Sequence, residues 1–401
     1  PICFVYGIPP KEMSLDDIQE IIRSFGDAAV RAQSAGADAV EIHGAHGYLV
    51  AQFLSVHANQ RTDEYGGSFA NRARFMIEVV AEVRKRVGED YPILVRVSAE
   101  EFIKHGFQVE DIIGILPDLV AAGTDVIHAS IGTHGSPGGI TSAPAEYDAG
   151  WNVERAKKIK DAVDIPVIAV GRFTDPRAAD KVIASGDADM VAFGRQLLAD
   201  PDFLNKAKEG RVDDIRKCLA CNQGCIERLI LEMDASVRCA INPETGQELI
   251  APKGPAETPR RVWVIGGGPA GLTAALEAVK LRHEVTLYEK SDHLGGQVHY
   301  ARQAPFKKVY GDWIDWLAAQ IKSKGVTVKM GVTVTDEMLE SGDPEVVILA
   351  IGGQKSTLDI NGLDQPIVSD AWQVLNREKP AGKNVVIIGA GLIGMETADF
   401  L

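Results

Sequence analysis

RVWVIGGGPAG, residues 261–271, is a short apolar run that leads into a glycine-rich turn. The apolar run predicts a buried strand, and the residues after the turn predict a helix whose first amide groups face a ligand. Glu289 follows Gly271 by eighteen residues and ends a second apolar run, where a carboxylate can accept hydrogen bonds from a ribose. This order predicts a Rossmann-like dinucleotide-binding domain that uses Gly266, Gly268, Gly271 and Glu289.

A second copy of the glycine pattern lies near the end of the chain. The apolar run 385–388 predicts a strand and leads into Gly389, Gly391 and Gly394. Two such patterns in one half of a chain favour FAD on the first and NAD(P)H on the second, and tight glycine turns without a ligand are the alternative for each. Because the second copy stops a few residues later, at Leu401, we expect the sequence to be part of a longer protein.

The first half of the chain has a different rhythm. Between residues 14 and 210, amphipathic helical stretches alternate with the apolar runs 38–42, 93–97, 126–130, 167–170 and 190–193. Near-continuous apolar strands that alternate with helices predict a parallel sheet covered by helices. Functional-looking residues directly after the strands suit the C-terminal face of a (β/α)8 barrel. The sequence shows five strand-helix units, whereas a complete (β/α)8 barrel has eight, so a doubly wound open sheet is the alternative.

Four of the five cysteines lie between the two halves. Cys218, Cys221 and Cys225 form a CxxCxxxC motif, and Cys239 follows after thirteen further residues. Three thiolates from one short loop and a fourth from a following turn suit a 4Fe-4S cluster. A structural zinc site is the alternative, although such sites usually pair two CxxC or CxxH knuckles. A disulfide framework fits less well, because the chain is not cysteine-dense, and we expect Cys3 to be a buried or free thiol.

Charge and hydropathy narrow the class of partner. The formal net charge is −14, and the sequence has no basic stripe interleaved with aromatic residues, which disfavours nucleic acid and anionic membranes as partners. No apolar run reaches the length of a membrane span, and nothing resembles a targeting peptide. We therefore expect a cytoplasmic protein with a small-molecule partner, no nucleic acid and no membrane, and leave open whether it forms a homo-oligomer.

The segment EIHGAHGYLVAQFLSVHANQRTDEYGGSFANRARF, residues 41–75, is very similar to the active-site segment of the Old Yellow Enzyme family of flavin ene-reductases. With the cysteine motif and the dinucleotide-binding half attached, the chain resembles the multidomain branch that contains 2,4-dienoyl-CoA reductase, clostridial enoate reductases and trimethylamine dehydrogenase. The resemblance implies an α/β fold: a partial (β/α)8 TIM barrel, an iron-sulfur segment and a Rossmann-like FAD/NAD(P)-binding domain. It implies FMN, FAD, a 4Fe-4S cluster and NAD(P)H as cofactors.

The resemblance also assigns catalytic roles. It implies that His43 and His46 hydrogen-bond the carbonyl oxygen of the substrate and that Tyr48 donates a proton. Two imidazole donors would stabilise the negative charge that builds on this oxygen as hydride adds to the β-carbon, and a phenol can then protonate the α-carbon. His134 is similar in position to a second catalytic histidine that helps Tyr48, and a substrate-shaping loop is the alternative for it. Ordinary structural histidines are the alternative for His43 and His46.

The flavin contacts follow in the same way. Arg96 matches the family arginine that approaches the flavin pyrimidine, and a surface or ion-paired arginine is the alternative. Gly171 with Arg172, and Gly194 with Arg195, end strands that resemble the last two of the barrel. Backbone amides and arginine side chains at these positions suit the FMN phosphate. Simple barrel-closing turns are the alternative.

These observations divide the chain into three parts. We expect residues 1–210 to be the C-terminal part of the FMN-binding barrel and residues 211–258 the iron-sulfur segment with its linker. Residues 259–401 would be the FAD-binding domain with the start of the NAD(P)H-binding subdomain. Within it, Gly295 and Gly296, like the later run VVILAIGG, resemble FAD-binding segments of pyridine-nucleotide-linked flavoproteins.

The predicted function is NAD(P)H-dependent reduction of an activated C=C bond. The substrate would be an unsaturated acid or an enoyl- or dienoyl-CoA, with electrons passing from NAD(P)H through FAD and the 4Fe-4S cluster to FMN. An amine dehydrogenase that runs the barrel chemistry in the opposite direction is one alternative. A non-catalytic electron-relay subunit is the other.

Overall fold

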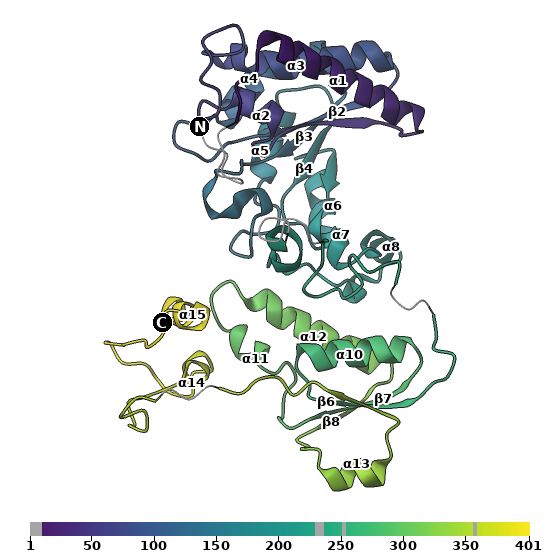
Figure 1. The fold of residues 1–401 in the computed structure, drawn as a ribbon, viewed down its shortest axis with the longest axis vertical. Coiled ribbons are helices and arrows are strands. Elements are labelled where there is room, and N and C mark those ends of the chain that lie inside the picture. The colour runs from purple at the N-terminus through teal and green to yellow at the C-terminus, as the bar shows by residue number, and fades with distance from the viewer. Residues whose placement is uncertain (1–9, 229–235, 251–253, 356–358) are drawn as a thin grey trace. The chain divides into compact units, whose positions relative to one another are not determined.

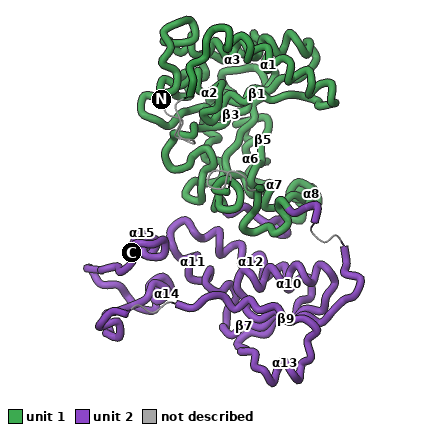
Figure 2. The backbone as a smooth tube through the Cα atoms, viewed as in Figure 1, with its two compact units in different colours: residues 1–212, 220–246 green, residues 213–219, 247–401 purple. Residues whose placement is uncertain are grey.

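The computed structural model describes residues 10–228, 236–250, 254–355 and 359–401 (Figure 1). Cys3 therefore lies outside the described residues. The chain forms two compact units, Pro1–Val212 with Ala220–Gly246, and Asp213–Leu219 with Gln247–Leu401 (Figure 2). Each unit has its own parallel sheet.

The first unit alternates strands and helices along the chain. The described elements are α1 (Leu15–Ser34), β1 (Val40–Gly44), α2 (Leu49–Leu54), α3 (Phe69–Val87), β2 (Ile93–Ser98), α4 (Val109–Ala121), β3 (Val126–Ser130), η1 (Pro137–Ser142), α5 (Val153–Lys160), β4 (Val167–Val170), α6 (Pro176–Ala184), β5 (Met190–Ala192), α7 (Arg195–Ala199), α8 (Phe203–Lys208) and η3 (Gln223–Glu227), with the short turn η2 (Val212–Asp214) at the boundary of the units. The five strands pair in the order β1-β2-β3-β4-β5, all parallel. A doubly wound sheet would reverse this order at a switch point, whereas a (β/α)8 barrel keeps it. The barrel-type fold is confirmed, and the doubly wound alternative is wrong.

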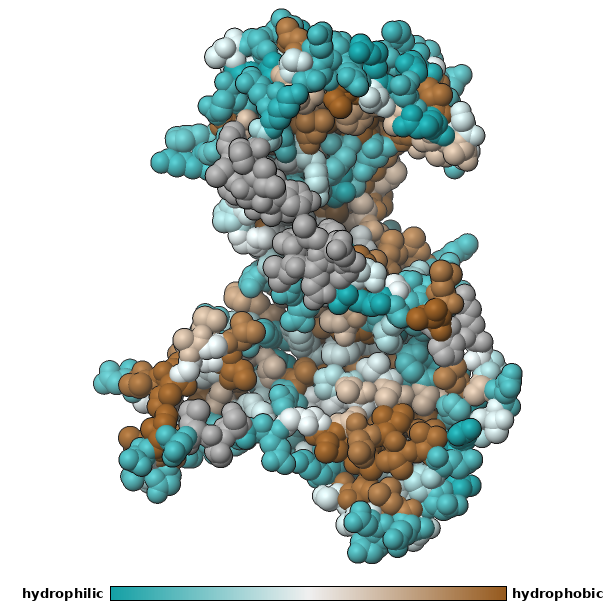
Figure 3. Space-filling model, in the orientation of Figure 1, coloured by the Kyte–Doolittle hydropathy of each residue, from teal (hydrophilic) through white to brown (hydrophobic). Residues whose placement is uncertain are grey.

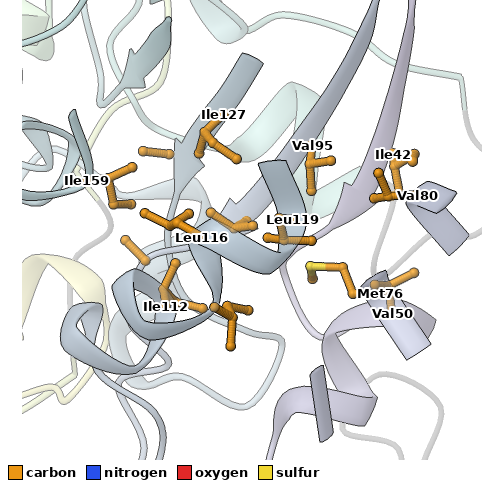
Figure 4. Close-up of a cluster of buried hydrophobic side chains, with 14 of the residues drawn as sticks. Ile42, Val50, Met76, Val80, Val95, Ile112, Leu116, Leu119, Ile127 and Ile159 are labelled. Atoms are coloured by element: carbon orange, nitrogen blue, oxygen red, sulfur yellow. The ribbon is translucent and has the colours of Figure 1, made fainter. Parts of the chain in front are cut away.

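The core of the first unit lies between the sheet and the helices that cover it. Ile127 of β3 lies near Leu116 of α4 and Ile159 of α5, and Ile42 of β1 lies beside Val80 of α3 (Figure 4). All of these side chains are buried, so water is excluded from this side of the sheet. Because successive residues of a strand point to opposite faces, the alternate residues are left for polar side chains on the other face.

The later part of the segment 41–75 forms the connection between α2 and α3. After α2, the chain makes a turn in which Arg61 pairs with Asp63 at 2.5 Å between Nη2 and Oδ2. Asn59 Nδ2 donates to the carbonyl oxygen of Tyr65 at 2.6 Å, and burial together with the hydrogen bond to Glu78 raises the pKa of Tyr65 to about 12. This part of the family-like segment therefore stabilises the connection between α2 and α3.

The second unit contains an open parallel sheet. Its described elements are β6 (Arg261–Ile265), α10 (Pro269–Lys280), β7 (Glu284–Glu289), α11 (Val298–Ala301), α12 (Lys308–Ser323), β8 (Thr327–Met330), α13 (Asp336–Gly342), β9 (Val346–Leu349), α14 (Ala371–Leu375) and α15 (Leu392–Phe400). The strand order is β8-β7-β6-β9, so the chain reverses direction beside β6. Sheets of this kind bind ligands outside the carboxyl end of the strands at the reversal point. The glycine-rich turn follows β6 and therefore lies at that point.

Helices cover one face of this sheet. Leu272 and Leu276 of α10 and Leu317 of α12 pack with the strands in one buried cluster. The alternate residues of β9, Val347 and Leu349, are exposed, and Figure 3 shows apolar surface over these strands. In the described ranges, no helix is both long enough and apolar enough to cross a bilayer.

The prediction of a strand at 385–388 is wrong. These residues are exposed, by 89% for Val386, and no strand of the described chain pairs with them. An apolar run becomes a strand only beside a neighbour that satisfies its backbone hydrogen bonds. The helix predicted after the second glycine pattern does form, as α15.

Candidate active site

The predicted catalytic and flavin-binding residues of the first unit lie at one edge of its sheet. Parallel strands all end at the same edge, and each of the five strands contributes. His43 lies on β1 and Arg96 on β2, while the others directly follow a strand: His46 and Tyr48 follow β1, His134 follows β3, Gly171 and Arg172 follow β4, and Gly194 and Arg195 follow β5.

Four predicted catalytic side chains contact one another. The ring centroid of His43 lies 5.0 Å from the ring centroid of His46 and 5.2 Å from that of Tyr48. The rings of Tyr48 and His134 meet nearly edge to face, with centroids 4.5 Å apart. Gly47 permits this approach, because a Cβ on it would lie 3.2 Å from the backbone nitrogen of His134 and its φ is +78°.

Two serines that were not predicted from the sequence hold His46 in place. The His46 backbone has φ +62°, an uncommon left-handed conformation for a residue with a side chain, and its N–H donates to Ser98 Oγ at 3.0 Å. The His46 ring contacts Ser130, with 2.6 Å between Nε2 and Oγ. Ser98 and Ser130 are the last residues of β2 and β3 and are partners in the sheet register. A polar residue at the carboxyl end of a predicted parallel strand is the signal that could have identified them.

The histidines of the site are electrically neutral. Burial lowers the pKa of His46 to about 3, and the positive charge of Arg96 adds to this effect. Burial is also the main cause that lowers the pKa of His43 and of His134. A neutral imidazole carries a single N–H, so each ring can donate from one nitrogen only.

This neutrality predicts a pH-dependent stability of the first unit. Between about pH 6 and pH 4 the unfolded chain protonates His46, whereas the folded chain does not, so the free energy of unfolding falls as the pH falls, by about 1.4 kcal/mol per pH unit for this one proton. Hydrogen exchange of peptides from β1 and β3, recorded at several pH values, measures this pH dependence of the free energy of unfolding. His46→Gln should remove this component, and His105→Gln, at an exposed position, should retain it. Equal slopes for wild type and His46→Gln would contradict the assignment.

Arg96 has a donor that suits a flavin. Its Nη2 donates to Ser130 Oγ at 3.1 Å, while its Nε is buried and has no hydrogen-bond partner among the described residues. Buried donors are almost always paired, so this nitrogen fits a ligand acceptor such as the pyrimidine edge of FMN. The role itself stays a prediction.

Arg195 joins the end of β5 to the cysteine segment of the same unit. It donates to the carbonyl oxygen of Ser142 at 3.1 Å and to Asn222 Oδ1 at 2.6 Å. Asn222 directly precedes η3, which contains Cys225. Arg172 Nη1 donates to the carbonyl oxygen of Ala145 at 3.2 Å. The phosphate-binding roles of both arginines, with Gly171 and Gly194, remain predictions.

The cysteine motif is divided between the two units. Cys218 belongs to the segment assigned to the second unit, and the other three cysteines belong to the first. Burial, and then the charges of Cys225 and Cys239, raise the pKa of Cys221, so these three thiols lie within electrostatic reach. The described residues contain no group of three or more His, Cys, Asp or Glu side chains close enough to hold a metal. The thiol donor set suits an iron-sulfur cluster, whose iron atoms are held by cysteine thiolates.

The glycine-rich turn after β6 is built for close approach. Gly266 has φ +109°, and a Cβ on Gly271 would lie 1.8 Å from the Gly266 carbonyl oxygen. Gly268 is the N-cap residue of α10, and a Cβ on Gly296 would lie 3.2 Å from Gly268 Cα. Glu289 Oε2 accepts a backbone N–H of the same turn at 2.6 Å. These contacts keep side chains away from the start of α10, where a pyrophosphate would bind.

The second glycine pattern repeats this geometry. Gly389 has φ +110°, and a Cβ on Gly394 would lie 1.9 Å from the Gly389 carbonyl oxygen. Gly391 is the N-cap residue of α15, with φ −78° and ψ 179°, close to the −76° and −177° of the N-cap Gly268. The turn thus has the same backbone in both copies, although a strand precedes only the first.

Comparison with known proteins agrees with this geometry. Residues 2–214 match the NADH:flavin oxidoreductase / NADH oxidase family, and residues 260–401 match the pyridine nucleotide-disulphide oxidoreductase family. The chain is 44% identical to an NADH oxidase from Thermoanaerobacter brockii and 38% identical to a cinnamate reductase from Clostridium sporogenes. Each alignment covers 100% of this chain and 62% of the relative.

A solved structure of 2-naphthoyl-CoA reductase with 2-naphthoyl-CoA is also similar. Its TM-score is 0.92 at 35% identity, and the match covers 98% of this chain and 60% of the other. The chain thus spans about three fifths of the length of these proteins. The family matches imply FMN, FAD and NAD(P)H as cofactors. With the barrel sheet and the dinucleotide fold in series, the resemblance seen in the sequence is confirmed: the chain belongs to the NADH:flavin oxidoreductase / NADH oxidase family, in its multidomain branch similar to Old Yellow Enzyme.

Proposed function

We propose that the complete protein is a cytoplasmic, NAD(P)H-dependent ene-reductase that reduces the activated C=C bond of an enoate or an enoyl- or dienoyl-CoA. Electrons would reach FMN from NAD(P)H by way of FAD and a 4Fe-4S cluster. The observation that carries the proposal is the contact of His43, His46, Tyr48 and His134 at the carboxyl edge of the barrel sheet. Relatives named for cinnamate and for 2-naphthoyl-CoA support this substrate class.

The two histidines stabilise charge on the substrate. Reduced FMN, when bound, supplies the hydride that adds to the β-carbon. As it adds, negative charge builds on the carbonyl oxygen, and His43 and His46 each donate one N–H to that oxygen. Fixed donors aimed at a developing oxyanion are worth about 10²–10³-fold in rate each. Arg96 would hold the pyrimidine edge of the flavin through its unpaired Nε–H.

Tyr48 completes the reaction with a proton. Its side chain is 49% exposed, which leaves the phenol accessible to a substrate. The hydroxyl donates its proton to the α-carbon, and solvent restores it. His134 contacts the phenol ring edge to face and holds it in place.

The four motif cysteines would hold the cluster. Direct hydride transfer between two flavins needs their reacting atoms roughly 3–3.5 Å apart. Flavins bound in two separate domains cannot meet that limit. A cluster on Cys218, Cys221, Cys225 and Cys239 supplies single-electron transfer instead.

The proposal is tested by mixing the dithionite-reduced full-length enzyme with cinnamoyl-CoA in a stopped-flow spectrometer. Reoxidation of the flavin together with formation of the saturated thioester is expected. In an amine dehydrogenase the flavin would stay reduced when the thioester is added, and the oxidised flavin would be reduced by an amine. The flavin of a relay subunit would react with neither compound. Failure of a panel of enoyl-CoA thioesters and free enoates to reoxidise the flavin would overturn the proposal.

A further inference from the structure

Ser130 lies between the side chains of Arg96 and His46. Its hydroxyl oxygen is 3.1 Å from Arg96 Nη2 and 2.6 Å from His46 Nε2. Ser130 is buried, with 3% of its surface exposed, at the end of β3. The sheet register between β2 and β3 pairs Ser130 with Ser98, two residues after Arg96.

The hydrogen-bonding capacities of the three groups restrict their arrangement. Arginine only donates, so Ser130 Oγ accepts from Arg96 and keeps one hydrogen and one lone pair. If His46 Nε2 carried a hydrogen, it would donate to Oγ, and the serine hydrogen would have no acceptor among the described residues. A buried donor left unpaired costs about 1–3 kcal/mol. If the serine hydrogen points to a bare Nε2, all three groups are paired.

The charge of Arg96 favours the same arrangement. A bare Nε2 presents its lone pair toward the serine and the guanidinium beyond it, whereas an Nε2–H would present its positive end. Because His46 is neutral, its single hydrogen then sits on Nδ1. Nδ1–H is therefore the one donor that His46 can offer to a substrate.

We propose that Ser130 is a positioning residue that holds His46 as the Nδ1–H tautomer, so that this N–H donates to the substrate carbonyl oxygen. The proposal rests on the ene-reductase function for the identity of the acceptor, but not for the tautomer. The chain of hydrogen bonds from Arg96 through Ser130 to His46 also polarises the imidazole toward the substrate. The histidine motif alone therefore does not complete the oxyanion-stabilising site, because residue 130 decides which nitrogen donates.

The tautomer is measured by NMR of the flavin-loaded full-length protein labelled with 15N-histidine, with His46→Gln assigning the signal. The ring nitrogens of wild type should report a bare Nε2 and a protonated Nδ1. Ser130→Ala should shift the hydrogen toward Nε2 and lower kcat for an enoyl thioester by about tenfold or more, with a smaller change in KM. Ser130→Thr keeps the hydroxyl and should restore both, and Ser24→Ala, an exposed serine of α1, should change neither.

The wild-type spectrum decides the proposal even if Ser130→Ala does not fold. A hydrogen on Nε2 in the wild type would overturn it, whether or not the enzyme reduces alkenes. A bare Nε2 in an enzyme that reduces no alkene would leave the role of Ser130 intact and reject the ene-reductase function instead. An unchanged tautomer and rate in folded Ser130→Ala would also overturn it.

Discussion

Cys221→Ser in the complete protein is expected to abolish NAD(P)H-driven alkene reduction while NAD(P)H still reduces FAD. A serine hydroxyl does not replace a thiolate on iron, so the cluster on the CxxCxxxC loop is lost. In the first unit, the charges of Cys225 and Cys239 both act on Cys221. Rapid mixing with NAD(P)H should show flavin reduction that stops at FAD, and iron analysis should show the loss of the cluster.

Dithionite provides the control for this variant. It reduces the barrel flavin without the cluster, so dithionite-driven turnover should survive in Cys221→Ser and would show that the barrel site is intact. Cys3→Ser changes a cysteine outside the motif and should leave both activities unchanged. If a cluster-free Cys221→Ser protein turned over alkene with NAD(P)H at the wild-type rate, the proposed electron path would be wrong.

The strands of the first unit could be predicted because they are short apolar runs that alternate with helices, whereas β8 of the second unit, whose side chains are mostly exposed, was not predicted. The runs 126–130 and 167–170 match β3 and β4 residue for residue, and the chain-order pairing follows from repeated βα units. The same apolar pattern failed at 385–388, because whether a run forms a strand depends on a neighbouring strand, which local sequence does not supply. The glycine turn after that run was predictable, since positive φ and close backbone approach are local requirements.

The site divides in the same way. His43, His46 and Tyr48 lie within one short segment, so the family-like motif identifies them together. Ser130 contacts His46 across 84 positions of sequence, and that contact depends on the register between β2 and β3. The neutral state of His46 likewise depends on its burial and on the charge of Arg96, a residue of β2 that is distant from His46 in the sequence. Sequence patterns therefore predict the residue types of the site, and the tertiary register sets their protonation.

Tyr48→Phe is expected to lower kcat for alkene reduction by about 10²–10⁴-fold, the usual contribution of a positioned proton donor. The substitution removes only the hydroxyl, so the ring contacts with His43 and His134 remain. Reduction of the enzyme by NAD(P)H should be unchanged, because no proton from Tyr48 is needed there. Single-turnover mixing of reduced enzyme with an enoyl thioester measures the affected step directly.

Tyr91→Phe is the matched control, because its hydroxyl donates to a backbone carbonyl in the same unit, at 2.8 Å, away from the site residues. It should keep the wild-type rate. In D2O the wild-type product should carry deuterium at the α-carbon, and the step slowed in Tyr48→Phe should be this proton transfer. A wild-type rate in Tyr48→Phe would mean that another group supplies the proton. His134, whose ring lies 4.5 Å from that of Tyr48, would be the first candidate, and the double variant with His134→Gln would then have to lose the activity.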